Sequence, residues 1–136
     1  MTSEKGRAVI LFRILTSVAV AAGLSLGCNG PSPPDPSDPE VARGILQKAL
    51  DSWKRGETPD AHMQSESVVV IEAAWKKGGK LTDYEIQNET EHAGYDVRFK
   101  VKLVVQEAGG AAKKQNALYN VCTTPKLVVK RAEGGW

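Results

Sequence analysis

The stretch LTDYEIQNETEHAGYDVRFKVKLVVQE, residues 81–107, decides the fold of this chain. Hydrophobic and polar residues alternate along both of its halves, which is the period of a half-buried β-strand. The dipeptide Ala93-Gly94 lies between the two halves and fits a two-residue hairpin turn. The sequence therefore predicts two long antiparallel strands that are joined at this turn.

With Ala93-Gly94 as the turn, His92 pairs with Tyr95 and the register of the hairpin is fixed. The solvent face then pairs Glu89 with Arg98, Glu85 with Lys102 and Gln87 with Lys100, and the other face pairs Thr90 with Val97, Asn88 with Phe99, Ile86 with Val101 and Tyr84 with Leu103. A slip of one residue would turn every charge toward the core, so the alternation supports this register.

An amphipathic helix is predicted upstream, over PEVARGILQKALDSWK. Asp38 suits the N-cap, Pro39 suits the first helical position, and Glu40 complements the helix dipole. Gly56 is a suitable stop at the other end, and Pro59 lies beyond it. The residues expected on its apolar face are Val41, Ile45, Leu46, Ala49, Leu50 and Trp53.

Further elements follow from apolar runs that are bounded by turn residues. Residues 67–74, 115–123 and 127–130 predict strands, and residues 60–64 predict a short helix. The C-terminal sequence EGGW is expected to be frayed. The predicted fold class is α+β: one N-terminal amphipathic helix packed on a curved antiparallel four- to five-stranded meander sheet, in a single domain of residues 39–136.

The first 27 residues have the arrangement of a secretory signal peptide. Lys5, Arg7 and Arg13 precede an uncharged, largely apolar run over residues 14–27. An uncleaved spanning helix over residues 8–27 is the alternative, but Arg13 would cost about 2.5–3.5 kcal/mol near the centre of a bilayer. The leader therefore predicts export, with residues 1–27 removed.

The segment Leu24-Ser25-Leu26-Gly27-Cys28 resembles the lipobox of bacterial lipoproteins, in which a small residue precedes an invariant cysteine. In that family the cysteine sulfur takes a diacylglyceryl group, a peptidase cuts just before the cysteine, and the new amine is acylated. Gly27 and Cys28 fit the pattern, whereas Ser25 stands where the family usually has leucine and Leu26 where it usually has a small residue. The resemblance implies lipidation of Cys28 and a location in the bacterial cell envelope, anchored to a membrane and facing the periplasm or the exterior. Ordinary signal cleavage nearby, with Cys28 incidental, is the alternative.

Residues 28–38 are predicted to form a tether after the lipidated cysteine. Pro31, Pro33, Pro34 and Pro36 alternate here with small and polar residues that have nothing to bury. At about 3.1 Å per residue in a polyproline conformation, ten such residues span roughly 30 Å.

The charge balance and the spacing of the His and Cys residues argue against two classes of function, nucleic-acid binding and metal binding. The part of the chain after residue 27 holds 18 − 3 = 15 basic and 16 − 1 = 15 acidic residues. This balance argues against a nucleic-acid partner, because phosphate binding requires uncompensated Lys and Arg. His62, His92 and Cys122 lack the spacing of metal ligands, so we expect neither a metal site nor a cofactor.

The element order over residues 39–131 resembles the cystatin-like superfold, which includes the nuclear-transport-factor-two-like domains. Enzymes on this superfold place an acid–base pair inside the cone of the sheet. The resemblance implies a candidate pocket at Tyr84, Asn88 and Tyr119, which the pattern turns inward. The predicted register turns the carboxylates of the hairpin outward, so we expect no general base and assign no catalytic residue.

The sequence thus predicts a small lipid-anchored envelope protein that acts as a non-catalytic binding or interaction module. Its expected partners are the membrane, through the N-terminal lipid, and an envelope protein. The alternative is a small-molecule-binding or enzymatic domain of the nuclear-transport-factor-two-like type. A deep pocket with a buried carboxylate would favour the alternative, and a filled core would favour the module.

Overall fold

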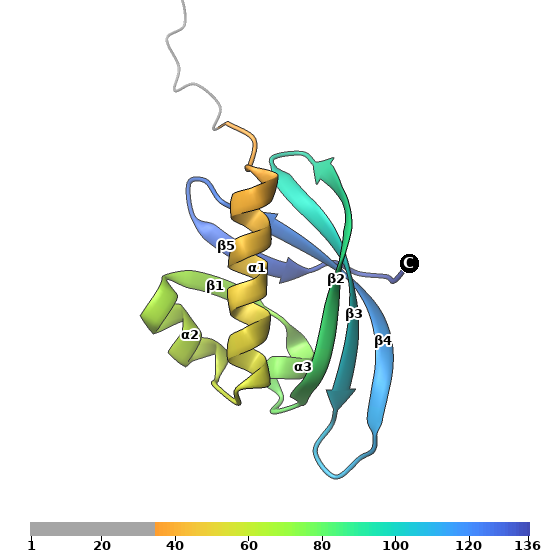
Figure 1. Ribbon diagram of the computed structural model, residues 1–136. Helices are drawn as coiled ribbons and strands as arrows, with labels where there is room; N and C mark the ends of the chain where they lie inside the picture. Colours follow the sequence, from red (N-terminus) through yellow and green to blue (C-terminus); the bar gives the residue numbers. More distant parts are fainter. Residues whose placement is uncertain (1–34) are drawn as a thin grey trace, which may run out of the picture. The chain divides into compact units, whose positions relative to one another are not determined.

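The computed structural model describes residues 35–136 (Figure 1). The expected signal peptide, Cys28 and the first part of the tether lie outside these residues. The elements are α1 (Pro39–Lys54), α2 (Pro59–Glu66), β1 (Val68–Ile71), α3 (Ala73–Lys76), β2 (Lys80–Ala93), β3 (Asp96–Gln106), β4 (Ala112–Cys122) and β5 (Leu127–Arg131). The fold is α+β, with α1 packed on a five-stranded sheet. None of the described helices has the length and hydrophobicity needed to cross a membrane.

The helix α1 begins at the predicted cap. The Asp38 carboxylate accepts hydrogen bonds from the backbone N–H groups of Glu40 (2.8 Å) and Val41 (3.1 Å). These two N–H groups of the first turn have no acceptor within the helix. The buried side chains of α1 are Ala42, Leu46, Ala49, Leu50, Ser52 and Trp53. Val41, which the periodicity assigned to this face, is 54% exposed, because α1 turns Ala42 toward the sheet instead.

The sheet differs from the predicted meander at one edge. Its strand order is β1-β5-β4-β3-β2. β2 to β5 form the antiparallel meander, whereas β1 pairs in parallel with β5, for example at Val68 and Leu127. Consecutive strands are neighbours roughly two-thirds of the time, which favoured a simple meander. Here α3 lies between β1 and β2 in the chain, and the two strands lie at opposite edges of the sheet.

The predicted hairpin is present, but its turn lies one residue further along. Ala93 pairs with Asp96, so the central residues of the turn are Gly94 and Tyr95. Gly94 has a φ of 67°. A two-residue turn centred on Ala93-Gly94 would require a positive φ at an alanine, whereas a turn that begins with glycine does not. The predicted turn was therefore wrong.

The register is consequently shifted by two residues at the tip of the hairpin. Glu91, not Glu89, lies opposite Arg98. Further from the turn, the predicted pairs are confirmed: Tyr84 with Leu103, Glu85 with Lys102, and Ile86 with Val101. An irregular segment of residues 87–89 in β2 joins the two registers. A shift of two residues leaves each side chain on its own face, so the alternation of the sequence could not detect it.

Arg43 of α1 holds this irregular segment. Its Nη2 donates to the backbone carbonyls of Gln87 (2.7 Å) and Asn88 (3.4 Å), and its guanidinium lies 5.4 Å from the centroid of the Phe99 ring. The bulge in β2 thus has its carbonyl groups satisfied from the helix.

Residues 35–38, which belong to the predicted tether, contact the domain. Ser37 is buried; its N–H donates to the Tyr95 carbonyl (2.9 Å) and its Oγ accepts from the Thr123 N–H (2.9 Å). The Thr124 hydroxyl donates to the carbonyl of Asp35 (3.1 Å). The chain therefore enters the domain at the end of the sheet that carries the β2–β3 turn and the β4–β5 loop (Figure 1).

Candidate functional site

The outer face of the sheet, on the side opposite α1, carries a row of basic side chains. Because side chains alternate along a strand, β3 turns Arg98, Lys100 and Lys102 outward between its buried apolar residues. Successive members of this row are about 6.6–6.8 Å apart along the strand. The neighbouring positions on β4 are Asn120, Leu118 and Asn116.

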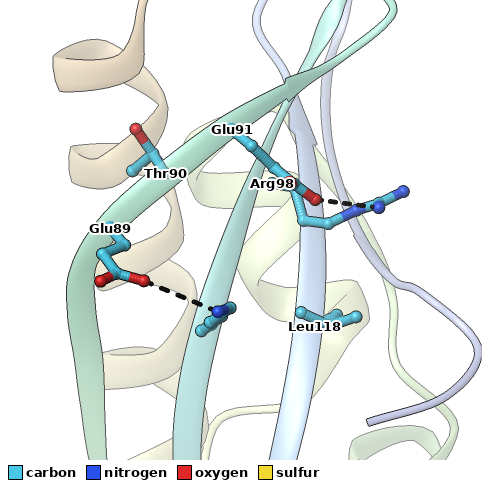
Figure 2. A pocket seen from close by; sticks show the side chains of 6 residues that line it. Glu89, Thr90, Glu91, Arg98 and Leu118 are labelled. Atoms are coloured by element: carbon cyan, nitrogen blue, oxygen red, sulfur yellow. Dashed lines mark hydrogen bonds and ion pairs between the residues drawn. The ribbon is translucent and has the colours of Figure 1, made fainter. Parts of the chain in front are cut away.

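The edge strand β2 supplies carboxylates to the same face. Glu91 Oε1 lies 3.1 Å from Arg98 Nη1, and Glu89 Oε2 lies 3.6 Å from Lys100 Nζ (Figure 2). With Thr90 and Leu118, these four residues line a hollow of about 90 Å³. The Glu91 and Glu89 side chains are 65% and 85% exposed, and such exposed pairs contribute only about 0–1 kcal/mol.

A second hollow, of about 270 Å³, lies further along the same strands. Lys102 of β3 and Lys114 of β4 line it, and β2 adds the carboxylates of Asp83 and Glu85 at its edge. Both lysines are exposed, and neither makes an ion pair within residues 35–136.

Basic residues are concentrated in this part of the sequence. Between Arg98 and Arg131 the chain has eight basic residues and one acidic residue, Glu107. Five of the lysines form no ion pair with any described residue: Lys102, Lys113, Lys114, Lys126 and Lys130. The charge balance of the whole domain concealed this local excess.

The C-terminal residues also lie on the outer face. The Trp136 ring centroid is 5.5 Å from Lys100 Nζ and 5.9 Å from Lys102 Nζ, within the range of cation–π attraction. Asn116 Nδ2 donates to the Trp136 carbonyl (3.2 Å). The expectation of a frayed EGGW segment was therefore wrong.

A buried carboxylate lies on the other side of the sheet. Glu72 is 4% exposed and accepts hydrogen bonds from the Tyr119 hydroxyl, the Ala74 N–H (3.1 Å) and Arg131 Nη1 (3.4 Å). Burial, and then the Glu72 charge, raise the pKa of Tyr119. The expectation of no inward carboxylate, which considered only the hairpin, was wrong. Its one signal in the sequence is the interruption of the apolar run VVVIEAAW by a glutamate.

The three residues of the predicted pocket have separate partners. Tyr119 is bonded to Glu72, and the half-buried Tyr84 donates its hydroxyl to the Asp51 carboxylate on α1. Burial and that hydrogen bond raise the pKa of Tyr84. Asn88 is exposed in the irregular segment of β2.

The histidines and Cys122 also have distinct environments. His62 is buried, with Nδ1 2.8 Å from Ser52 Oγ, a pair that the sequence pattern did not reveal. His92 is exposed, and the half-buried Cys122 donates its thiol to the Thr124 carbonyl (3.0 Å). Over residues 35–136, no three His, Cys, Asp or Glu side chains gather in a way that could hold a metal ion.

Comparisons of the chain with known protein families, with curated proteins and with solved structures found no match. Any functional assignment therefore rests on the residues and contacts described above.

Proposed function

We propose that this protein is a lipid-anchored module of the bacterial cell envelope that binds an acidic polypeptide through the outer face of its sheet, without catalysis. The observation that carries the proposal is the separation of charge within a neutral domain. Eight basic residues and one acidic residue lie between Arg98 and Arg131, and five of the lysines lack an ion pair among the described residues. Uncompensated exposed charge of one sign attracts a partner of the other sign.

The spacing of the basic row suits an extended peptide. Arg98, Lys100 and Lys102 repeat every second residue, and so do the side chains on one face of an extended ligand. A ligand with carboxylates at alternate positions would meet all three cations. Because Glu91 and Glu89 hold Arg98 and Lys100 in exposed, weak pairs, ligand carboxylates can replace them at little cost.

The carboxylates of β2 favour a narrow partner over a flat anionic membrane surface. Glu85, Glu89 and Glu91 lie along the edge of the same face. A bilayer wide enough to cover the face would bring its anionic headgroups against these glutamates, and like charges repel. A single segment over β3 and β4 avoids that repulsion and reaches Lys102 and Lys114.

The lipobox resemblance at Cys28 supplies the anchor in this proposal. Two or more acyl chains hold a protein stably on a bilayer, whereas one binds marginally. The tether would join the domain at Ser37, which is fixed between the β2–β3 turn and the β4–β5 loop. The outer face would then remain free for a partner beside the membrane.

The alternative, a small-molecule-binding or enzymatic domain on the cystatin-like superfold, draws support from the buried pair of Glu72 and Tyr119. Both carboxylate oxygens are already occupied, Oε1 by Ala74 N–H and Arg131 and Oε2 by Tyr119. A substrate would have to displace these partners inside a packed core, which makes the interaction module the better supported function.

The test is the affinity of the full-length protein, purified in detergent, for fluorescent poly-L-glutamate. We expect salt-sensitive binding that the double variant Lys102→Glu/Lys114→Glu weakens by roughly fourfold or more, since each reversal replaces an attraction of about 0.2–1 kcal/mol with a repulsion of similar size. The matched control is Lys76→Glu/Lys77→Glu, which makes the same charge change on exposed residues at α3.

Equal weakening by both double variants would contradict the assignment of the site to the outer face. Binding to phosphatidylglycerol vesicles without binding to polyglutamate would also contradict the proposal, because it would identify a membrane surface as the partner.

A further inference from the structure

The short helix α2 is attached to the domain mainly through one side chain. Of its eight residues only His62 is fully buried, at 0% exposure. The ion pair between Lys48 and Glu66 (3.5 Å) also links α2 to α1, but these side chains are 68% and 42% exposed, so the pair contributes little. The position of α2 therefore depends on the His62 imidazole.

This imidazole lies in an enclosed site between α1 and α3. Its Nδ1 is 2.8 Å from Ser52 Oγ, and its ring centroid is 6.0 Å from that of Trp75, which stacks on Trp53 at 5.6 Å. Ser52 Oγ also accepts a hydrogen bond from Arg55 Nη2 (3.1 Å). The buried Nε2 has no hydrogen-bond partner among the described residues.

The site accepts the neutral ring more readily than the cation. A neutral imidazole can donate from Nδ1 to Ser52 and leave only a lone pair unbonded at Nε2. The cation carries N–H groups at both nitrogens, so one would be buried without an acceptor, at the full cost of desolvation.

The surrounding charges do not reverse this preference. Glu66 on α2 and Glu57 in the α1–α2 loop favour the cation, while Lys48 of α1 and Arg55, which caps the end of α1, disfavour it. β1 has no titratable side chain, and α3 presents the Trp75 indole. Burial is the largest effect, and it lowers the pKa of His62.

We propose that α2 is a latch that neutral His62 holds closed, and that protonation of His62 releases the helix from α1 and α3. The released imidazole gains water at both nitrogens and keeps Glu66 one turn away on its own helix. Residues 58–60, at the start of α2, form one wall of a cleft of about 310 Å³ that Val70 and Trp75 also line. Release of α2 removes this wall and uncovers the apolar face of Trp75.

The direction of the pH response follows from the two affinities for protons. The released state binds the proton with the ordinary pKa of about 6.5, and the docked state binds it more weakly. The released population therefore increases as the pH falls below about 6.5, by up to about tenfold per pH unit, until the docked imidazole is itself protonated.

The test is hydrogen exchange of the full-length protein in detergent at pH 7.5, 6.5 and 5.5, corrected for the intrinsic pH dependence of exchange. We expect the protection of the α2 amides to fall about fivefold from pH 6.5 to 5.5 and about tenfold from pH 7.5 to 5.5, while that of the α1 amides stays unchanged. His92→Gln, which alters the other, exposed histidine of the chain, should respond as the wild type does. His62→Phe should lose the response.

A pH response that persists in His62→Phe, or α2 protection that stays constant in the wild type, would overturn the latch. Where His62→Phe does not fold, NMR titration of the wild-type imidazole decides. A midpoint below 6.5 that coincides with the loss of α2 protection supports the latch, and a midpoint at 6.5 with α2 protection unchanged overturns it.

Discussion

At the scale of single residues, Gly44 and Gly94 show how backbone conformation, rather than available space, determines the effect of an alanine on stability. Gly44 lies on the exposed side of α1, and Gly94 is the first central residue of the hairpin turn. A Cβ added at either position would meet no atom within 4 Å. Only Gly94 has a positive φ, of 67°. The consequence of an alanine therefore depends on the backbone alone.

We expect Gly44→Ala to raise the free energy of unfolding by roughly 0.5–1 kcal/mol, because glycine is a poor residue for a helix interior. Gly94→Ala should lower it by about 1–2 kcal/mol, because an alanine is strained at a positive φ. Urea denaturation of the two variants measures both effects. Stabilisation by Gly94→Ala would contradict the turn at residues 94–95.

At the scale of elements, the sequence predicted what local chemistry determines. The cap at Asp38 and the apolar period gave the start and the buried face of α1, and the alternation over residues 81–107 gave both strands of the hairpin. The position of the turn was wrong because it depends on a single φ. The tip register was wrong because a shift of two residues preserves the alternation of faces.

The pairing of elements that are far apart in the chain was not predictable, because the face pattern of a segment does not specify its partner. β1 is four apolar residues long, and nothing in VVVI specifies whether it joins β2 or β5. Likewise, Glu72 and Tyr119 are 47 residues apart in the chain and meet only after β4 and β5 are in place. The contacts of Arg43 with β2 and of Ser52 with His62 also arise from packing between elements. A sequence pattern indicates which face a residue takes, but not which residue it will meet.

At the scale of the whole molecule, the part of the chain after residue 27 has equal numbers of acidic and basic residues, but the two kinds are unevenly divided among the strands. β2 holds four acidic residues and one basic residue, whereas β3 to β5 together hold seven basic residues and one acidic residue. The near-zero net charge argued against a nucleic-acid partner, but it could not reveal a basic sheet face. That face became visible only when the register placed Lys102 and Lys114 beside one hollow.

The proposed membrane anchor is testable by metabolic labelling with a palmitate analogue in bacteria. We expect the wild type to be labelled and Cys28→Ser to lose the label, because the sulfur and the amine of Cys28 are the proposed attachment points. Cys122→Ser, at the chain's other cysteine, should remain labelled. Labelling that persists in Cys28→Ser would rule out this anchor.

The measurement that tests the proposed interaction most directly is zero-length carbodiimide coupling of the full-length protein to a polyglutamate peptide, followed by mass spectrometry. The reagent joins a lysine amine only to a carboxylate in contact with it, so the linked lysines identify the binding surface. We expect links at Lys100, Lys102, Lys114 and Lys130, on the outer face of the sheet. Links that are spread evenly over the exposed lysines, or that gather at Lys48, Lys54, Lys76 and Lys77, would contradict the proposed interaction.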